Sequence, residues 1–150
     1  MFHQTAALFA EIGDVRQSES LVRCRRIQAS ANEVGGMETC QPEAVHTEMK
    51  LLLKSYHAIK KTSFDDILDF HVRFEAIHPF QDGNGRVGRL IMFKECLANG
   101  YVPFIITDEL KMFYYRGLHE WGKINGFLSD TCLTAQDNYK SILDYFKIKY

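Results

Sequence analysis

The sequence predicts an all-α, mainly helical domain of about six helices with one small β-hairpin flap. Apolar side chains recur at three- and four-residue spacing through most of the chain, which is typical of helices that bury one face. Capping residues and glycine stops divide these stretches into separate helices. The length of 150 residues suits a single domain around one hydrophobic core, and 46% hydrophobic with 25% charged residues is ordinary for a globular protein.

The first 39 residues divide into three expected segments. Residues 5–12 predict a short helix with one apolar face, and the polar residues 13–20 predict a loop. Residues 21–39 contain the pair Gly35-Gly36 near apolar positions, which favours a β-hairpin or an irregular flap. A plain surface loop is the alternative interpretation of that segment.

Two helices follow with clear boundary signals. Pro42 and Glu43 favour a helix start that runs to about Lys61, because proline and a carboxylate both suit the first turn. Ser63 with Asp66 three residues on resembles a capping box, which predicts a second helix from residue 64. The expected buried stripes are Val45, Met49, Leu52, Tyr56 and Ile59 in the first helix, and Ile67, Phe70, His71, Phe74 and Ile77 in the second.

Three further helices are expected in the second half of the chain. Residues 86–98 are apolar almost all round, with Leu90, Ile91, Phe93 and Leu97, which predicts a buried central helix that stops at Asn99-Gly100. After an extended apolar link at 102–106, Asp108 could cap a helix that runs to about residue 121, with apolar side chains on one face. That face comprises Leu110, Phe113, Tyr114 and Leu118. A last helix is expected over 129–148, with a stripe of Cys132, Ala135, Tyr139, Ile142 and Phe146.

Charge and hydropathy exclude several classes of function. A net charge of −1 supplies no basic excess to neutralise phosphates, which argues against non-specific binding of nucleic acid or of an anionic membrane. No apolar run approaches the length of a membrane span, and the first residues lack the pattern of a secretory signal. We therefore expect a cytoplasmic protein.

Neither the cysteines nor the histidines form a metal-binding pattern. The cysteines are widely spaced, so free thiols in a reducing cytosol are expected rather than a disulfide framework or a zinc site. They are Cys24, Cys40, Cys96 and Cys132. His71 and His78 lie two helical turns apart and could be interpreted as a metal pair, but we expect a half-buried His71 with satisfied hydrogen bonds.

Residues 78–89, HPFQDGNGRVGR, concentrate the chemistry of the chain. His78 precedes a proline, which disfavours the right-handed helical region and predicts that the preceding helix ends there. The Gly-Asn-Gly turn then feeds a new helix, whose free N–H groups favour an anion. Arg86 and Arg89 lie on one side of that helix and could bind phosphate oxygens. Asp82 is an oxygen ligand suited to Mg²⁺, and an imidazole suits proton abstraction near neutral pH. Together these residues predict a nucleoside polyphosphate site beside a general base.

The same stretch matches, at every fixed position, the H-x-F-x-D-G-N-G-R-x-x-R signature of the Fic family, and the chain is identified as resembling a Fic domain over 1–150. It differs from the related Doc toxins, which have a lysine where this chain has Gly85. The resemblance implies a flap at about 21–39, where a target segment adds as a strand, and an active-site loop with its central helix at 78–98.

The resemblance also implies roles for individual residues. His78 would deprotonate a target hydroxyl, and Asp82 would hold Mg²⁺ against the phosphates. The phosphates would be bound by the N–H groups of Gly83, Asn84 and Gly85, by the Asn84 side chain, and by Arg86 and Arg89. Phe80 would brace the loop, and Tyr115 on a later helix would contact the nucleobase.

The implied activity is Mg²⁺-dependent transfer of AMP from ATP to a Ser, Thr or Tyr hydroxyl of a target protein. Removal of AMP, phosphotransfer or transfer of another nucleotide on the same scaffold are alternatives, and a non-catalytic protein-binding module is a further one. Many Fic proteins carry an inhibitory S/T-x-x-x-E-G/N helix, but here Ser30 is followed four residues on by Val34. We therefore expect no self-inhibition, either because an upstream helix is missing or because a separate inhibitory partner protein supplies the carboxylate.

Overall fold

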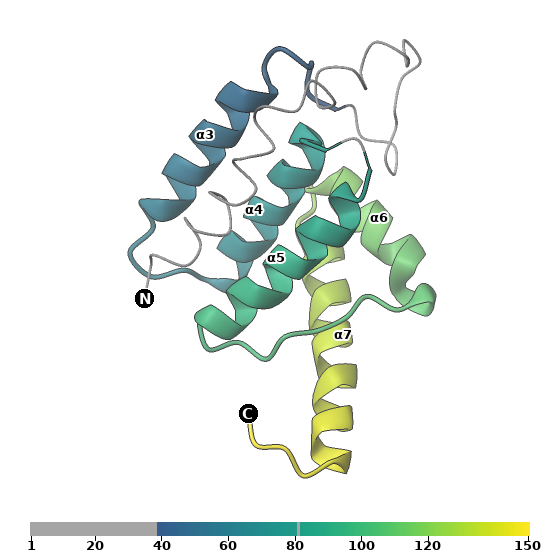
Figure 1. Ribbon diagram of the computed structural model, residues 1–150. Helices are drawn as coiled ribbons and strands as arrows, with labels where there is room; N and C mark the ends of the chain where they lie inside the picture. Colours follow the sequence, from purple (N-terminus) through teal and green to yellow (C-terminus); the bar gives the residue numbers. More distant parts are fainter. Residues whose placement is uncertain (1–38, 81) are drawn as a thin grey trace.

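The computed structural model describes residues 39–80 and 82–150, and within them the chain is helical (Figure 1). The elements are α3 (Val45–His57), α4 (Phe64–Ile77), α5 (Asn84–Ala98), a 3₁₀ helix (Asp108–Leu110), α6 (Lys111–Glu120) and α7 (Gly126–Tyr145). These residues contain no strand, which agrees with the predicted all-α class. The expected helix at 5–12, the loop at 13–20 and almost all of the flap at 21–39 lie outside the described residues, so the hairpin stays a prediction.

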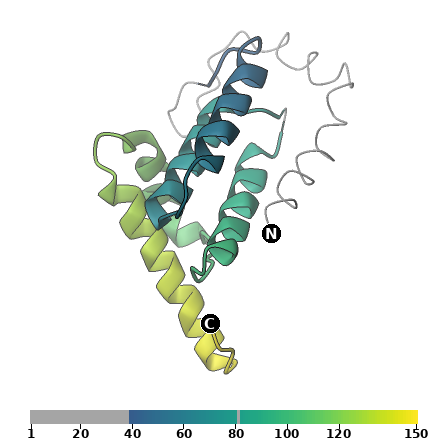
Figure 2. The same cartoon turned by 90° about the vertical axis from the view of Figure 1, so that its left-hand side faces the viewer.

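The central helix is α4, and its start is set by local sequence. Ser63 accepts a hydrogen bond from the backbone N–H of Asp66, whose carboxylate accepts one from the Ser63 backbone N–H, so the predicted capping box is confirmed. The helix contacts α3, α5 and α7. The predicted stripe is buried, and His71 is fully rather than half buried. Figures 1 and 2 show α4 running beside α3 and α5.

The predicted burial of α5 is wrong. Ile91, Met92 and Cys96 face the core, but Leu90 is 69% exposed and Leu97 is 58% exposed. The helix therefore has one exposed apolar side, and α4 has the central position that we expected α5 to occupy. The predicted stop is confirmed, because α5 ends at Ala98 and Gly100 takes a positive φ of 78°.

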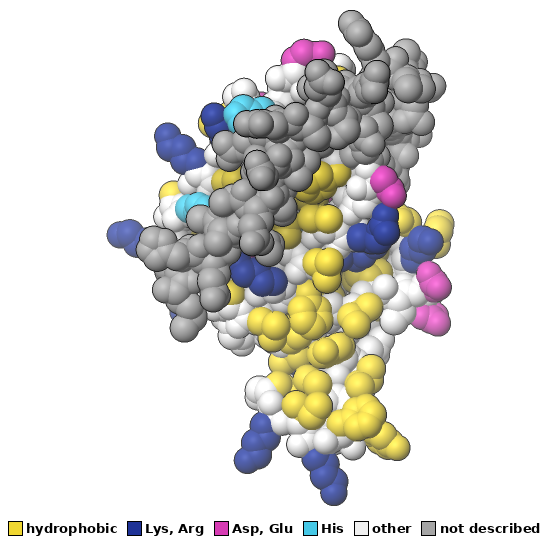
Figure 3. All heavy atoms as spheres, viewed as in Figure 1, with side chains coloured by type: hydrophobic (Ala, Val, Ile, Leu, Met, Phe, Trp, Pro, Cys, Tyr) yellow, Lys and Arg dark blue, Asp and Glu magenta, His cyan; other side chains and the backbone are white. Residues whose placement is uncertain are grey.

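The remaining helices also differ from expectation in detail. Asp108 does not cap the helix but begins the 3₁₀ turn, and Phe113, expected to face the core, is 57% exposed. Helix α7 begins three residues earlier and ends three residues earlier than predicted. Its last turns extend beyond the other helices in both views (Figures 1 and 2), so Ile142 and Phe146 of the predicted stripe are exposed. Figure 3 shows apolar side chains gathered over the lower part of the face that it presents.

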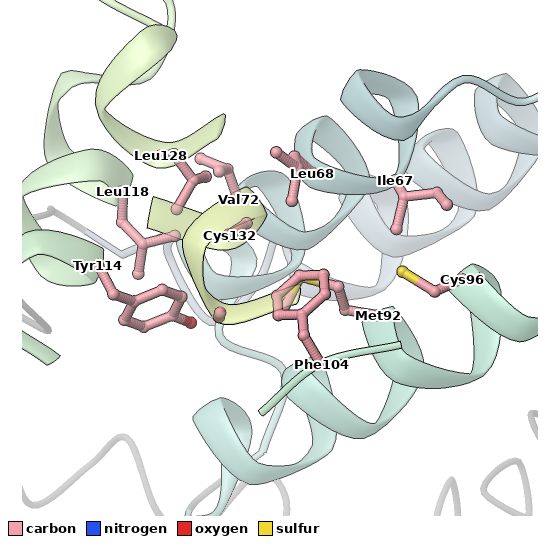
Figure 4. Close-up of a cluster of buried hydrophobic side chains, with 11 residues drawn as sticks. Ile67, Leu68, Val72, Met92, Cys96, Phe104, Tyr114, Leu118, Leu128 and Cys132 are labelled. Atoms are coloured by element: carbon pink, nitrogen blue, oxygen red, sulfur yellow. The ribbon is translucent and has the colours of Figure 1, made fainter. Parts of the chain in front are cut away.

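Two clusters of buried side chains hold the helices together, and α4 contributes to both. The smaller cluster joins α3 to α4 and α5 through Leu52, Phe74 and Ile91, with the predicted α3 residues Val45, Met49 and Tyr56 packed against it. The larger cluster joins α4, α5, α6 and α7, and Figure 4 shows its side chains converging. Burial on both sides fixes the C-terminal end of α4, from which the 78–89 loop departs.

Candidate functional site

The 78–89 segment begins where α4 ends at His78. This residue has φ 53° and ψ 59°, in the left-handed region, and its N–H still donates to the carbonyl of Phe74. The helix therefore ends where the following proline predicted, although His78 is left-handed rather than extended. Positive φ is uncommon for a residue with a side chain and is concentrated at functional sites, because the surrounding structure must enforce it.

The loop is closed by the side chain of Asn84. Its Oδ1 accepts from the N–H of Phe80 at 2.8 Å, and its Nδ2 donates to the carbonyl of Phe80 at 2.7 Å. The Phe80 ring packs against the smaller core cluster, 6.2 Å from the Phe74 ring, as the predicted brace requires. Asn84 is 2% exposed, so its side chain maintains the loop in this structure, and its expected contact with a phosphate stays a prediction.

The N-terminus of α5 is a positively polarised helix end that favours the binding of an anion. Its N-cap is Gly83, at φ 81°, which supplies no side-chain cap, and its first turn contains no acidic residue. Helix α4, in contrast, carries Asp65 and Asp66 in its first turn. Arg86 instead places a positive charge beside the positive end of α5, which is unfavourable unless an anion lies between them.

Asp82 and Arg86 form an ion pair at the start of α5. Arg86 donates to Asp82 Oδ2 at 2.9 Å, and the N–H of Gly83 donates to Asp82 Oδ1 at 2.6 Å. The N–H of Gly83, which we expected to bind phosphate, is therefore already used in this structure. Both charged side chains are largely exposed, 71% for Arg86 and 89% for Asp82, so the pair stabilises the fold by at most about 1 kcal/mol and could be opened by a ligand.

A single exposed carboxylate fits a magnesium ion that arrives with a nucleotide. Mg²⁺ in proteins usually keeps several waters and takes one or two carboxylates together with substrate phosphates. No group of three or more His, Cys, Asp or Glu side chains gathers as a metal cluster in the described part of the chain. Asp82 thus suits a shared metal ion but not a fully protein-held one.

The other predicted site residues take distinct positions. His78 is half buried, and its Nδ1 is inaccessible to solvent. Arg89 is half buried, and one of its terminal nitrogens lies 3.0 Å from where a Cβ on Gly85 would stand, so its guanidinium lies along the first turn of α5. Tyr115 is half buried, with its ring 5.5 Å from that of Tyr114, and packs against the larger cluster. Its contact with a nucleobase stays a prediction.

Sequence reasoning placed His71 and Tyr114 on buried helix faces but missed Glu75 and the meeting of the three side chains close to this site. His71 and Glu75, four residues apart on α4, and Tyr114 on α6 are each no more than 2% exposed. The charge of Arg89 acts on the pKa of all three. The signal was present in the sequence, since Glu75 lies one turn after His71 on the apolar face, where a carboxylate is uncommon.

The hollow between α3 and α4 lies away from the motif. It measures about 70 Å³ and is lined by residues that include Ser55, Asp69 and Arg73, none of them from 78–89. Ligand pockets usually measure roughly 300–1,000 Å³, so this hollow does not hold a nucleotide. None of the helices in the described ranges has the length and apolarity that crossing a bilayer would require.

Comparison with known proteins gives the chain its family. A model of the Fic/DOC family matches residues 2–96. The chain belongs to the Fic/DOC family. Its relatives include protein adenylyltransferase fic-1 of Caenorhabditis elegans, 30% identical over 65% of this chain and 20% of that protein. A probable protein adenylyltransferase of Aquifex aeolicus is 45% identical over 45% of this chain and 19% of its own length.

The similarity to a third relative is more local. Protein adenylyltransferase Fic of Drosophila virilis is 44% identical over 32% of this chain and 10% of its own length. The chain thus spans a fifth or less of each of these three relatives. The family is shown by these matches, whereas the activity of this chain is inferred from its site.

Proposed function

We propose that this Fic-family chain is a protein adenylyltransferase that transfers AMP from ATP to a hydroxyl group of a target protein. The observation that carries the proposal is the N-terminus of α5, which has no side-chain cap, no acidic residue in its first turn and an arginine there. A ligand with several negative charges would accept from the first N–H groups of α5, which have no partner within the helix, and would replace Asp82 as the partner of Arg86. The names of the relatives support ATP as the donor of that charge.

The reacting groups follow from the loop. The imidazole of His78 accepts the proton of a Ser, Thr or Tyr hydroxyl, whose oxygen attacks the α-phosphorus of ATP. A bond forms between that oxygen and the phosphorus, the bond to the bridging oxygen breaks, and pyrophosphate leaves. Since the Nδ1 of His78 is buried, we assign proton transfer to its Nε2. A positioned base of this kind contributes roughly 10²–10⁴-fold to the rate.

The remaining motif residues stabilise the charge on the leaving side. The N–H groups of Asn84 and Gly85 face the phosphates, and Arg86 exchanges its ion pair with Asp82 for a β-phosphate oxygen. Arg89 binds the γ-phosphate. Asp82, once free of this pair, would be the residue that holds Mg²⁺, and the ion would supply positive charge to neutralise the phosphates. Because the exposed Asp82–Arg86 pair is weak, breaking it for this exchange costs little free energy.

Intact-protein mass spectrometry tests the proposal. The chain is incubated with ATP and Mg²⁺, alone or with a hydroxyl-bearing acceptor protein, beside His78→Ala as the matched control. We expect a mass increment of one adenylyl group with the parent chain and none with the variant. An increment of one phosphate, or equal modification by both proteins, would contradict the assigned reaction or the assigned base. Calorimetry with ATP should give similar affinities for the two proteins, because His78 does not hold the phosphates.

A further inference from the structure

Helix α7 carries one apolar seam that continues beyond the core of the domain. Its members alternate three and four positions apart and therefore lie along one side of the helix. They are Leu128, Cys132, Ala135, Tyr139, Ile142 and Phe146. The first three are at most 2% exposed, whereas Ile142 is 53% and Phe146 is 65% exposed. The side of α7 that packs in the core is thus the side that faces solvent near its end.

The end of α7 has a defined shape. The N–H of Lys147 donates to the carbonyl of Asp144 at 3.0 Å, and the N–H of Ile148 donates to the carbonyl of Leu143 at 2.9 Å. Lys147 takes a positive φ of 56°, as the residue after a helix does in a Schellman motif. We call residues 142–150, which extend beyond the other helices in both views (Figures 1 and 2), the tip.

The charged residues of this part of α7 lie away from the seam. Asp137 and Asp144 are each two positions from a seam residue, which places them on the opposite side of the helix. Lys140 pairs with Asp137 at 2.9 Å. No seam position holds a charge, so two copies of the seam can approach each other without like charges meeting.

A second exposed apolar surface lies on α5 and on the segment that follows it. Leu90 and Leu97 are 69% and 58% exposed, and Ile105 is 59% exposed. We call these three residues the stripe. The rings of Phe93 on α5 and Tyr139 on α7 meet edge-on at 6.0 Å, which joins α5 to the seam. Figure 3 shows apolar side chains running from the middle of this face to its lower end.

The combined area is what a stable dimer requires. The exposed apolar residues of the tip and the stripe present roughly 500–850 Å², if an aromatic side chain carries about 150–250 Å² and an aliphatic one about 60–120 Å². The largest apolar patch of an ordinary monomer is roughly 300–600 Å². A typical specific interface buries about 800 Å² of each partner.

We propose that the chain forms a two-fold symmetric dimer in which the tip of each copy lies against the stripe of the other. A two-fold axis brings the same pair of surfaces together twice, so one operation covers both the projecting tip and the stripe. The pairing does not depend on the proposed enzymatic activity.

Sedimentation velocity of the full chain tests this pairing. Interfaces of standard size bind with micromolar or tighter affinity, so we expect a species of twice 17.4 kDa at about 50 µM chain. Ile142→Glu in the tip and Leu97→Lys in the stripe should each weaken self-association at least about tenfold, because each places a charge in an apolar contact. Both side chains are largely exposed, so circular dichroism should show unchanged helix content.

Leu133→Glu is the matched control for Ile142→Glu. Leu133 also lies on α7 and is 43% exposed, but nine positions before Ile142 place it on the opposite side of the helix. This variant should dimerise like the parent chain.

A mixture of the two charged variants distinguishes tip-to-stripe pairing from pairing of two tips. In a dimer of Ile142→Glu with Leu97→Lys, one contact brings the new carboxylate to the new ammonium and the other contact keeps both parent residues. We therefore expect the equimolar mixture to regain the dimer that each variant lacks alone.

Three results would overturn the proposal. The first is a parent chain that stays monomeric at about 50 µM, the concentration at which a standard-size interface forms; this surface would then belong to a different protein. The second is an intact dimer in Leu97→Lys, which would indicate pairing of two tips. The third is an equal loss of association in Leu133→Glu and Ile142→Glu.

Discussion

Replacing Gly88 by alanine tests the packing of the buried His71 and Glu75 side chains against α5. The new methyl group would lie 2.4 Å from Oε1 of Glu75 and 2.9 Å from Cε1 of His71, closer than packed atoms approach. Both neighbours are at most 2% exposed, so neither can swing into solvent. Over-packing of this kind costs roughly 1–3 kcal/mol or more.

Helix propensity opposes that cost. Alanine is favoured over glycine in a helix interior by roughly 0.8–1.0 kcal/mol, so we expect Gly88→Ala to lose up to about 2 kcal/mol in total. For a chain of this size, each kcal/mol lowers the melting temperature by roughly 2–4 °C, which predicts a fall of up to about 8 °C. Because the methyl group also displaces the groups around Arg89, ATP affinity should fall in the same variant.

Gly126→Ala is the control for this measurement. Gly126 is also helical, at the start of α7, but its nearest neighbour to a new Cβ is a side-chain oxygen of Asp130 at 3.8 Å, an ordinary contact. Its melting temperature should be unchanged or slightly higher. Calorimetric melting of both variants distinguishes the two outcomes. If Gly88→Ala is as stable as Gly126→Ala, the close approach of His71 and Glu75 to α5 is refuted.

Three further predictions follow from the described contacts. Ser63→Ala should lower the free energy of unfolding by about 1 kcal/mol, measured with urea, since it removes the cap of α4; no loss would show that the cap is not needed. Asn84→Ala should lower the free energy of unfolding by roughly 1–3 kcal/mol and reduce AMP transfer, because the N–H and the carbonyl of Phe80 both lose their partner. Full activity of this variant would show that these two hydrogen bonds are not needed to hold the loop. Burial raises the pKa of Glu75 from 4.5 to about 7, so its folded-state contribution is present below pH 4.5 and lost as pH rises through 7. Glu75→Gln should therefore gain stability relative to the parent chain between pH 4.5 and 7.5, and a difference that is flat with pH would contradict this titration.

Local sequence predicted the features whose causes are local. The start of α4 follows from a capping box between Ser63 and Asp66, and the end of α5 follows from Asn99-Gly100, so both could be located without tertiary information. The candidate site residues of the 78–89 motif could also be predicted from the sequence, because they lie within one twelve-residue stretch. The start of α5 was placed two residues late, since nothing in Asn84-Gly85 favours a helix until the Asn84 side chain closes the loop on Phe80.

Burial was predicted less well, because it depends on which helices become neighbours. Apolar residues surround α5, yet Leu90 and Leu97 face outward, and the central position belongs to α4. The buried cluster of His71, Glu75 and Tyr114 was missed for the same reason. His71 and Glu75 share a helix face in the sequence, but their meeting with Tyr114, 43 residues beyond His71, exists only in the folded chain.

Titration of the chain with ATP and with AMP, in the presence of Mg²⁺, tests the central claim most directly, namely that the first turn of α5 grips a triphosphate. We predict that ATP binds tightly and AMP weakly, and that Arg86→Ala removes most of this difference while leaving the melting temperature within about 2 °C of the parent value, because its exposed ion pair contributes little to stability. Equal affinities for ATP and AMP in the parent chain, or an unchanged preference for ATP in Arg86→Ala, would contradict the account.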